Sequence, residues 1–210
     1  LTRTMPRSVA ATTGLDAISH AIESYLSTRR NGLSQMFARQ AWRLLSAGFV
    51  RGVADPEDAE ARAAMLLGAH LAGVAIENSM LGAAHALANP LTARFGLEHG
   101  VAVGVMLPHV VRFNAPIVGG LYRDLVADAN LAAPDAEPTD AADRLAEWLS
   151  ETAGTVGLPT HLKACGVDRS ALPGLAEEAA RQWTGRFNPR PADAASLKEL
   201  YQWAWNNRTP

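Results

Sequence analysis

The sequence predicts an all-α protein, and three observations support that fold class. Apolar side chains recur at the spacing of helix faces along almost the whole of the 210 residues. Apolar residues make up 48% of the chain and charged residues 19%, which is typical of a globular domain with a large core. Neither a G-x-G-x-x-G motif nor a phosphate-binding loop follows any predicted strand. We therefore expect residues 1–210 to form one helical domain that does not hold a dinucleotide by itself.

The first predicted helix covers residues 14–27, where apolar side chains from Leu15 to Leu26 form a stripe at helical period. Thr12 and Thr13 precede this stripe, and their hydroxyl groups are suited to cap its N-terminus. The second predicted helix covers residues 33–50. Its side chains expected to face inward are Met36, Phe37, Ala41, Leu44 and Leu45.

Proline and glycine divide the rest of the chain. Asp55-Pro56 breaks the chain before the third helix, and Asn89-Pro90 is expected to interrupt the fourth. Residues 100–114 are rich in β-branched side chains, but their length and their Gly and Ala content favour a tightly packed helix. Residues 131–140 predict a loop rich in Pro and Asp. The predicted helices after the second are residues 56–76, 79–94, 100–114, 140–154, 170–182 and 193–206.

Charge and composition limit the partners that the chain can have. The formal net charge of −2 and the scattered arginines give no reason to expect nucleic acid or an anionic membrane. No apolar run is expected to be long enough to span a bilayer. The lone Cys165 excludes an internal disulfide and fits the reducing cytoplasm. The chain begins at Leu1 without the pattern of a secretory signal, so we expect it to be an interior part of a longer polypeptide.

Four residues form a candidate metal-ligand set. Asp16 and His20 are four apart, which places both side chains on one face of a helix. His85 and His99 flank a second helical segment, in which small residues let the backbone approach other helices. One carboxylate and three imidazoles suit Fe(II) or Zn(II) better than Ca(II) or Mg(II). The alternative for His20 and His85 is that each is an ordinary core histidine with a hydrogen-bond partner.

Other polar residues near this set have weaker assignments. His70 lies in an apolar stripe and is expected to pack, His109 is expected to cap or pack, and His161 follows a proline in a turn. None of these three is expected to bind the metal. Glu23 and Glu98 are candidates for hydrogen bonding a ligand ring, and the alternative is a solvated or ion-paired residue.

Three segments carry a resemblance to a known family: GLDAISHAIESYLS, LGAAHALANPLTARFGLEHGVAVGVMLPHVVRFN and NPRPADAASLKELYQWAW. They resemble the C-terminal half of the iron-containing (group III) alcohol dehydrogenases, whose helical domain is of the dehydroquinate synthase-like type. The resemblance implies that Asp16, His20, His85 and His99 bind the metal. The fourteen-residue spacing of the last two matches the family.

The resemblance also implies a function. The metal, Fe(II) or else Zn(II), activates an alcohol or a carbonyl substrate while hydride passes to or from NAD(P). In the family an N-terminal nucleotide-binding domain holds the NAD(P). That domain is absent here, so the resemblance implies that this chain alone binds metal without turning over alcohol. The Ala-rich helix faces and the five tryptophans of the chain leave apolar surface area that a homodimer would bury.

The chain departs from the family pattern at one position, and several alternative functions stay open. Many family members have a histidine four residues after the third ligand, and this chain has Asn89, which cannot relay a proton and is left to orient substrate or cofactor. A zinc-dependent polyol dehydrogenase or a maleylacetate reductase-like enzyme belongs to the same superfamily, although Asp16 argues against the metal-free reductases. An alternative of another class is a helical module whose metal has no redox role.

Overall fold

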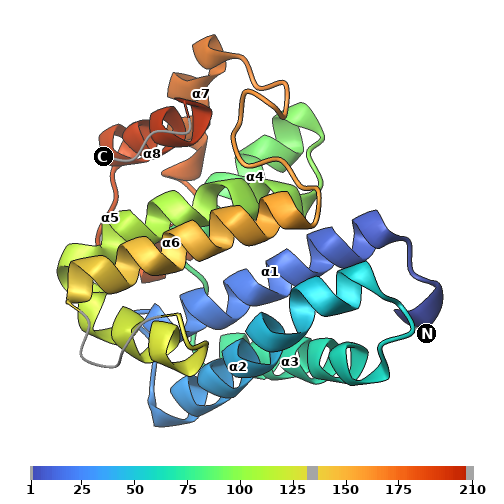
Figure 1. Ribbon diagram of the computed structural model, residues 1–210. Coiled ribbons are helices and arrows are strands. Elements are labelled where there is room, and N and C mark those ends of the chain that lie inside the picture. The colour runs from blue at the N-terminus through green and yellow to red at the C-terminus, as the bar shows by residue number, and fades with distance from the viewer. Residues whose placement is uncertain (1, 132–136, 207–210) are drawn as a thin grey trace.

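The computed structural model describes residues 2–131 and 137–206, and within these ranges the regular structure is entirely helical (Figure 1). This confirms the all-α prediction. The elements are η1 (Thr2–Thr4), α1 (Arg7–Leu26), α2 (Gly32–Ala54), α3 (Ala59–Glu77), α4 (Ala83–Phe95), α5 (His99–Asp128), α6 (Pro138–Thr155), η2 (Arg169–Ala171), α7 (Leu172–Ala179), η3 (Trp183–Phe187) and α8 (Ala194–Asn206).

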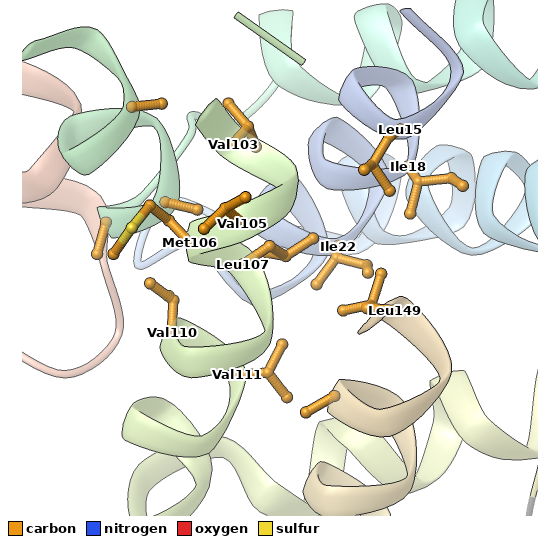
Figure 2. Close-up of a cluster of buried hydrophobic side chains, with 14 of the residues drawn as sticks. Leu15, Ile18, Ile22, Val103, Val105, Met106, Leu107, Val110, Val111 and Leu149 are labelled. Carbon is orange, nitrogen blue, oxygen red and sulfur yellow. The ribbon is translucent and has the colours of Figure 1, made fainter. Parts of the chain in front are cut away.

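Helix α1 lies at the centre of the fold. It packs against α2 and α3 on one side and against α5 on the other, and α5 in turn packs along α6 (Figure 1). Helices α7 and α8 pack on each other and join the rest through α4 and α5. Figure 2 shows the core where these layers meet, with Ile22 of α1, Leu107 of α5 and Leu149 of α6 in one buried cluster.

The start of α1 differs from the prediction. The helix begins at Arg7 after Pro6, whose carbonyl accepts a hydrogen bond from the backbone N–H of Ala10. Thr12 and Thr13 lie inside the helix, and both hydroxyl groups donate to the carbonyl of Val9. They do not cap the helix, because the residues before them continue the helical backbone.

Two inward-facing assignments are wrong. Met36 is 57% exposed, and Leu44 is only half-buried. The buried stripe of α2 runs through Ala38, Ala41 and Leu45. Met36 precedes Ala38 by two residues, so it lies about 200° around the helix from that stripe.

The second half of the chain also departs from the expected boundaries. Pro90 lies inside α4 without interrupting it, and the buried hydroxyl of Tyr201 donates to the carbonyl of Leu87 in the same turn. Residues 100–114 are helical as expected, but α5 continues to Asp128 across a kink at Val118. Helix α7 stops at Ala179, earlier than predicted. The predicted loop at 131–140 lies partly outside the described residues, and α6 already begins at Pro138.

Helices α1 and α5 approach each other closely at two glycines of α5. A Cβ atom at Gly100 would lie 2.0 Å from the backbone oxygen of Thr12, and one at Gly104 would lie 2.2 Å from Cδ2 of Leu15. Backbone proximity therefore requires glycine at position 100, whereas at position 104 a Cβ would meet the side chain of Leu15. The crossing places His99, which precedes Gly100, beside the middle of α1.

Helices α3 and α5 reach the length and mean hydropathy of a membrane span, which corrects the expectation that no apolar run is long enough. In α5, 72% of the most apolar window is buried in the protein core, whereas in α3 the share is 22%. Helix α5 therefore serves as the core helix of this fold. Helix α3 leaves apolar side chains on the surface, Leu66 and Leu67 among them.

Candidate metal centre

The structure brings together all four residues of the predicted ligand set. Asp16 and His20 lie one turn apart on α1, His85 is the third residue of α4, and His99 is the first residue of α5. The carboxylate atom Oδ1 of Asp16 lies 3.5 Å from Nε2 of His20, 3.5 Å from Nε2 of His85 and 3.7 Å from Nε2 of His99. Three imidazole nitrogens therefore surround one carboxylate oxygen.

These distances fit the ligand shell of a transition metal. Atoms held about 2.1 Å from a tetrahedral ion lie about 3.4 Å from one another. Ligand atoms of Asp16, His20 and His85 all lie within 4.8 Å of one another, and His99 approaches this triad through Asp16. Asp16 Oδ1 and His85 Nε2 are buried without a hydrogen-bond partner among the described residues. Buried polar atoms without partners are rare in folded proteins, so their convergence here suits a cation.

The start of α4 positions His85. The carboxylate of Glu23 accepts a hydrogen bond from the backbone N–H of Ala84 at 2.7 Å, and its second oxygen lies 2.5 Å from Nδ1 of His85. The oxygen that accepts from Ala84, Oε1, leaves little room just before the helix, because a Cβ at Gly82 would lie 2.9 Å from it. With Nδ1 directed at Glu23, the other ring nitrogen of His85 is directed at Asp16.

The metal-free protonation states follow from burial and charge. Burial lowers the pKa of His20 to about 4, and it also lowers the pKa of His99. Burial acts in the same direction on His85, but the carboxylates of Glu23 and Asp16 outweigh it and raise the pKa of His85 to about 9. Burial favours the neutral acid at Asp16, but the nearby imidazoles, His85 foremost, outweigh it and lower its pKa. At neutral pH the metal-free site therefore holds the Asp16 carboxylate beside neutral His20 and His99, whereas His85 must release a proton when a divalent cation binds.

Asn89 lies one turn after His85 on the same helix. Its side-chain amide donates a hydrogen bond to Oε1 of Gln182 at 3.0 Å. Gln182 precedes η3, which packs on α4 so closely that a Cβ at Gly185 would lie 3.3 Å from the Cβ of Ala86. Asn89 therefore links the ligand-bearing helix α4 to the C-terminal part of the chain.

The other histidines lie outside this cluster. His70 is exposed on α3, so the expectation that it packs in an apolar stripe is wrong. It faces away from the core because the buried residues of α3 are Ala61, Gly68, Ala72 and Ala75. His161 lies in a turn, where Nδ1 accepts from the backbone N–H of Ala164. His109 is buried on α5 and packs, as expected.

His109 predicts a pH dependence of stability. Burial, and to a lesser degree the charge of Arg112, lower the pKa of His109 to about 4, from an ordinary value of 6.5 in the unfolded chain. Between those values the unfolded state binds more protons, so the free energy of unfolding falls as the pH falls from about 6.5 to 4. Between pH 7.5 and 5.0, the free energy of unfolding should fall by about 2 kcal/mol less in His109→Gln than in the unmodified protein.

Urea unfolding in the presence of a chelator measures this difference at both pH values. The comparison of the two pH values in each protein removes any direct effect of the substitution on packing. Equal losses in the two proteins would show that His109 is protonated as readily in the folded as in the unfolded state.

Two contacts of the site join residues far apart in the sequence. Asn188, in the loop before α8, accepts a hydrogen bond from the backbone N–H of Ala83 and exchanges two hydrogen bonds with Asn114 of α5. Gln182 pairs with Asn89. Neither Asn188 nor Gln182 is predicted by spacing along the chain, because each lies 74 residues or more from its partners.

A known protein family matches almost the whole of this chain. The family model described as "Fe-containing alcohol dehydrogenase family, C-terminal" matches residues 10–205. The chain therefore belongs to the iron-containing alcohol dehydrogenase family, and its fold is that of the C-terminal helical domain.

Individual relatives agree with this assignment. Lactaldehyde reductase of Escherichia coli (strain K12) is 36% identical over 202 residues, which make up 96% of this chain and 52% of that protein. The crystal structure of 1,3-propanediol oxidoreductase is similar with a TM-score of 0.93 at 30% identity, over 97% of this chain and 53% of that one. Maleylacetate reductase from Rhizobium sp. strain MTP-10005 has a TM-score of 0.85 at 26% identity, over 100% of this chain and 56% of that one. The chain spans about half the length of the curated relatives that it matches.

Proposed function

We propose that this chain is the metal-binding half of an NAD(P)-dependent oxidoreductase that interconverts small alcohols with aldehydes or ketones. The observation that carries this proposal is the convergence of three imidazole nitrogens on the buried Oδ1 of Asp16, in a chain of the iron-containing family. This oxygen has no hydrogen-bond partner among the described residues. Asp16, His20, His85 and His99 are the proposed ligands. Fe(II) is the proposed metal because of the family, and Zn(II) suits the same donors.

Asp16, His20, His85 and His99 would hold the metal, which would supply Lewis-acid chemistry to the oxygen of an alcohol or carbonyl group during hydride transfer with a nicotinamide. The residues of this chain supply charge and orientation. Asp16 contributes the negative charge that attracts a divalent cation, and neutral His20 and His99 offer their lone pairs. The side chain of His99 is 37% exposed, so substrate would reach the site from the side of His99. Asn89 supplies an amide for orientation, since it cannot transfer a proton.

The nicotinamide cofactor would be held by a second half of the protein. The described helices include no nucleotide-binding unit, and the curated relatives are about twice as long as this chain. We propose a two-domain enzyme with the metal near the domain boundary, working in the cytoplasm. Exposed apolar side chains such as Met36 and Ile117 support a homodimer.

Three other functions fit some of the same observations. The likeness to maleylacetate reductase supports a reductase of the same superfamily, and a zinc-dependent polyol dehydrogenase would use the same donor set. A metal-binding module without redox chemistry would need the metal centre but no nicotinamide. The alcohol dehydrogenase function is favoured because Asp16 is retained and the relatives include lactaldehyde reductase and 1,3-propanediol oxidoreductase.

Metal binding tests the first part of the proposal. The protein, stripped of metal and titrated anaerobically with Fe(II) and with Zn(II), should bind about one equivalent of either. His20→Ala should reduce the affinity at least about 100-fold, because it removes one of the proposed ligands. His70→Ala is the matched control, since His70 is an exposed histidine on another helix. Substoichiometric binding, or equal affinity in His20→Ala, would contradict the metal centre.

Turnover tests the second part and requires a polypeptide that joins this chain to a nucleotide-binding domain. We expect NAD(P)H-dependent reduction of a small aldehyde, lost in His20→Ala and kept in His70→Ala. Metal binding without any nicotinamide-dependent turnover would favour the non-redox module instead.

A further inference from the structure

We propose that Glu23 is a positioning residue that fixes which nitrogen of His85 faces the metal. This inference rests on the proposed metal centre, and it assigns a role to a residue that does not itself reach the metal. Glu23 joins α1, which carries Asp16 and His20, to α4, which carries His85. Its carboxylate therefore connects the two helices at the level of the ligands.

The two oxygens of Glu23 match two donors at the start of α4. One oxygen accepts from the backbone N–H of Ala84 at 2.7 Å, and the other lies 2.5 Å from Nδ1 of His85. The N–H groups in the first turn of a helix have no partner within the helix, so Glu23 satisfies one of them from another helix. The residue is only 5% exposed, which means that water does not compete for these contacts.

Gly82 lies so close to the carboxylate of Glu23 that a side chain at this position would contact it. Gly82 immediately precedes α4, and a Cβ there would lie 2.9 Å from Oε1 of Glu23 and 3.1 Å from Oδ1 of Asn188. A side chain at position 82 would push the carboxylate away from the helix start. The absence of a side chain at Gly82 thus belongs to the same arrangement as Glu23.

The contact with His85 has a chemical consequence. A neutral imidazole carries one proton, and a carboxylate 2.5 Å from Nδ1 places that proton on Nδ1. The lone pair then lies on Nε2, which is the nitrogen near Asp16 and the one without a hydrogen-bond partner among the described residues. Carboxylates that accept from a ligand histidine in this way orient the ring and raise its basicity.

A purely structural role for Glu23 would have different effects. If Glu23 only capped α4, its loss would loosen the helix start without changing which nitrogen of His85 is protonated. Glu23→Gln separates the two roles, because it keeps the shape of the side chain but offers one acceptor to two donors. Its amide N–H₂ must then face either Ala84 N–H or His85 Nδ1–H.

The test uses Zn(II) as the probe, because Zn(II) is diamagnetic. In the Zn(II)-loaded protein with ¹⁵N-labelled histidine, long-range ¹H–¹⁵N spectra should show His85 with a proton on Nδ1 that exchanges slowly with water. In Glu23→Gln we expect that slow-exchanging proton signal to shift or disappear, and Zn(II) affinity measured by chelator competition to fall about 10- to 100-fold. Gly82→Ala keeps Glu23 but displaces its carboxylate, so it should weaken Zn(II) binding in the same direction even if Glu23→Gln does not fold.

Glu98→Gln is the matched control, because Glu98 is an exposed carboxylate next to another proposed ligand, His99. Among the described residues, the side chain of Glu98 makes no hydrogen bond to a ligand ring, so the expectation that it would do so is not met. The Zn(II) affinity of this variant should stay within about threefold of that of the unmodified protein, because an exposed charge interacts only weakly through solvent. If the unmodified protein binds Zn(II) and His20→Ala does not, while Glu23→Gln and Gly82→Ala bind normally, the metal centre stands and the role of Glu23 is overturned. If the unmodified protein itself binds no Zn(II), the metal centre falls.

Discussion

Alanine at position 100 is expected to lower the free energy of unfolding by about 3 kcal/mol or more, the upper end of the range for overpacked cores. The reason is the crossing of α1 and α5, where a Cβ at Gly100 would lie 2.0 Å from the backbone oxygen of Thr12. No rotamer change relieves this overlap, because the backbone of residue 100 fixes the position of its Cβ and the partner is a backbone atom of Thr12. The two helices must separate, and His99 at the start of α5 must move with them. Metal affinity should therefore fall together with stability.

Gly73→Ala is the control for this prediction. Gly73 lies inside α3, and a Cβ there would have nothing within 4 Å among the described residues. The same substitution should raise stability by about 0.5–1 kcal/mol at Gly73, because alanine suits a helix interior better than glycine. Thermal or urea unfolding of both variants measures the two effects. Unfolding free energies within 1 kcal/mol of the unmodified protein for Gly100→Ala would show that the helices do not cross this closely.

Local spacing predicts the parts of this site that lie on one helix. The four-residue separation of Asp16 and His20 is sufficient to place them on one face of α1, and the structure confirms that placement. The fold class also follows from the sequence, because apolar periodicity is a property of each segment by itself. Helix ends are predicted less well. Thr12 has the chemistry of an N-cap, but only the backbone before it decides where α1 begins.

Contacts between distant segments cannot be predicted in the same way. The approach of His99 to Asp16 depends on Gly100 meeting the backbone of Thr12, which no periodicity encodes. The bond from Asn89 to Gln182 depends on how η3 lies along α4. The family resemblance identifies the four proposed ligands without any knowledge of these contacts. The approach of the four side chains to one another follows only from how the helices pack.

Two helix N-termini and two carboxylates determine the electrostatics of the site. His85 and His99 both lie in the first turn of their helices, where the helix dipole places partial positive charge. A cation at such a position requires compensating negative charge. Glu23 binds the first turn of α4, and Asp16 lies between the three imidazoles. Two carboxylates thus offset two helix N-termini and leave the centre suited to a divalent ion.

His85→Ala is expected to have the largest effect of any substitution in the site, because His85 contacts both carboxylates. In the metal-free protein, removal of the ring leaves Glu23 buried without its charged partner, which should cost about 3 kcal/mol. In the presence of metal at about 100 times the dissociation constant, the unmodified protein gains about 2.7 kcal/mol that the variant cannot gain. The difference in unfolding free energy should therefore reach about 6 kcal/mol with metal present.

Urea unfolding with a chelator and with excess Zn(II) separates the two contributions. The chelator condition gives the effect of the unpaired Glu23 alone, and the difference between the two conditions gives the metal-dependent part. His70→Ala should change stability by less than about 0.5 kcal/mol in both conditions, because His70 is exposed on α3. If Zn(II) stabilised His85→Ala as much as the unmodified protein, the ion would bind without His85, and the ligand set would have to be reassigned to other residues.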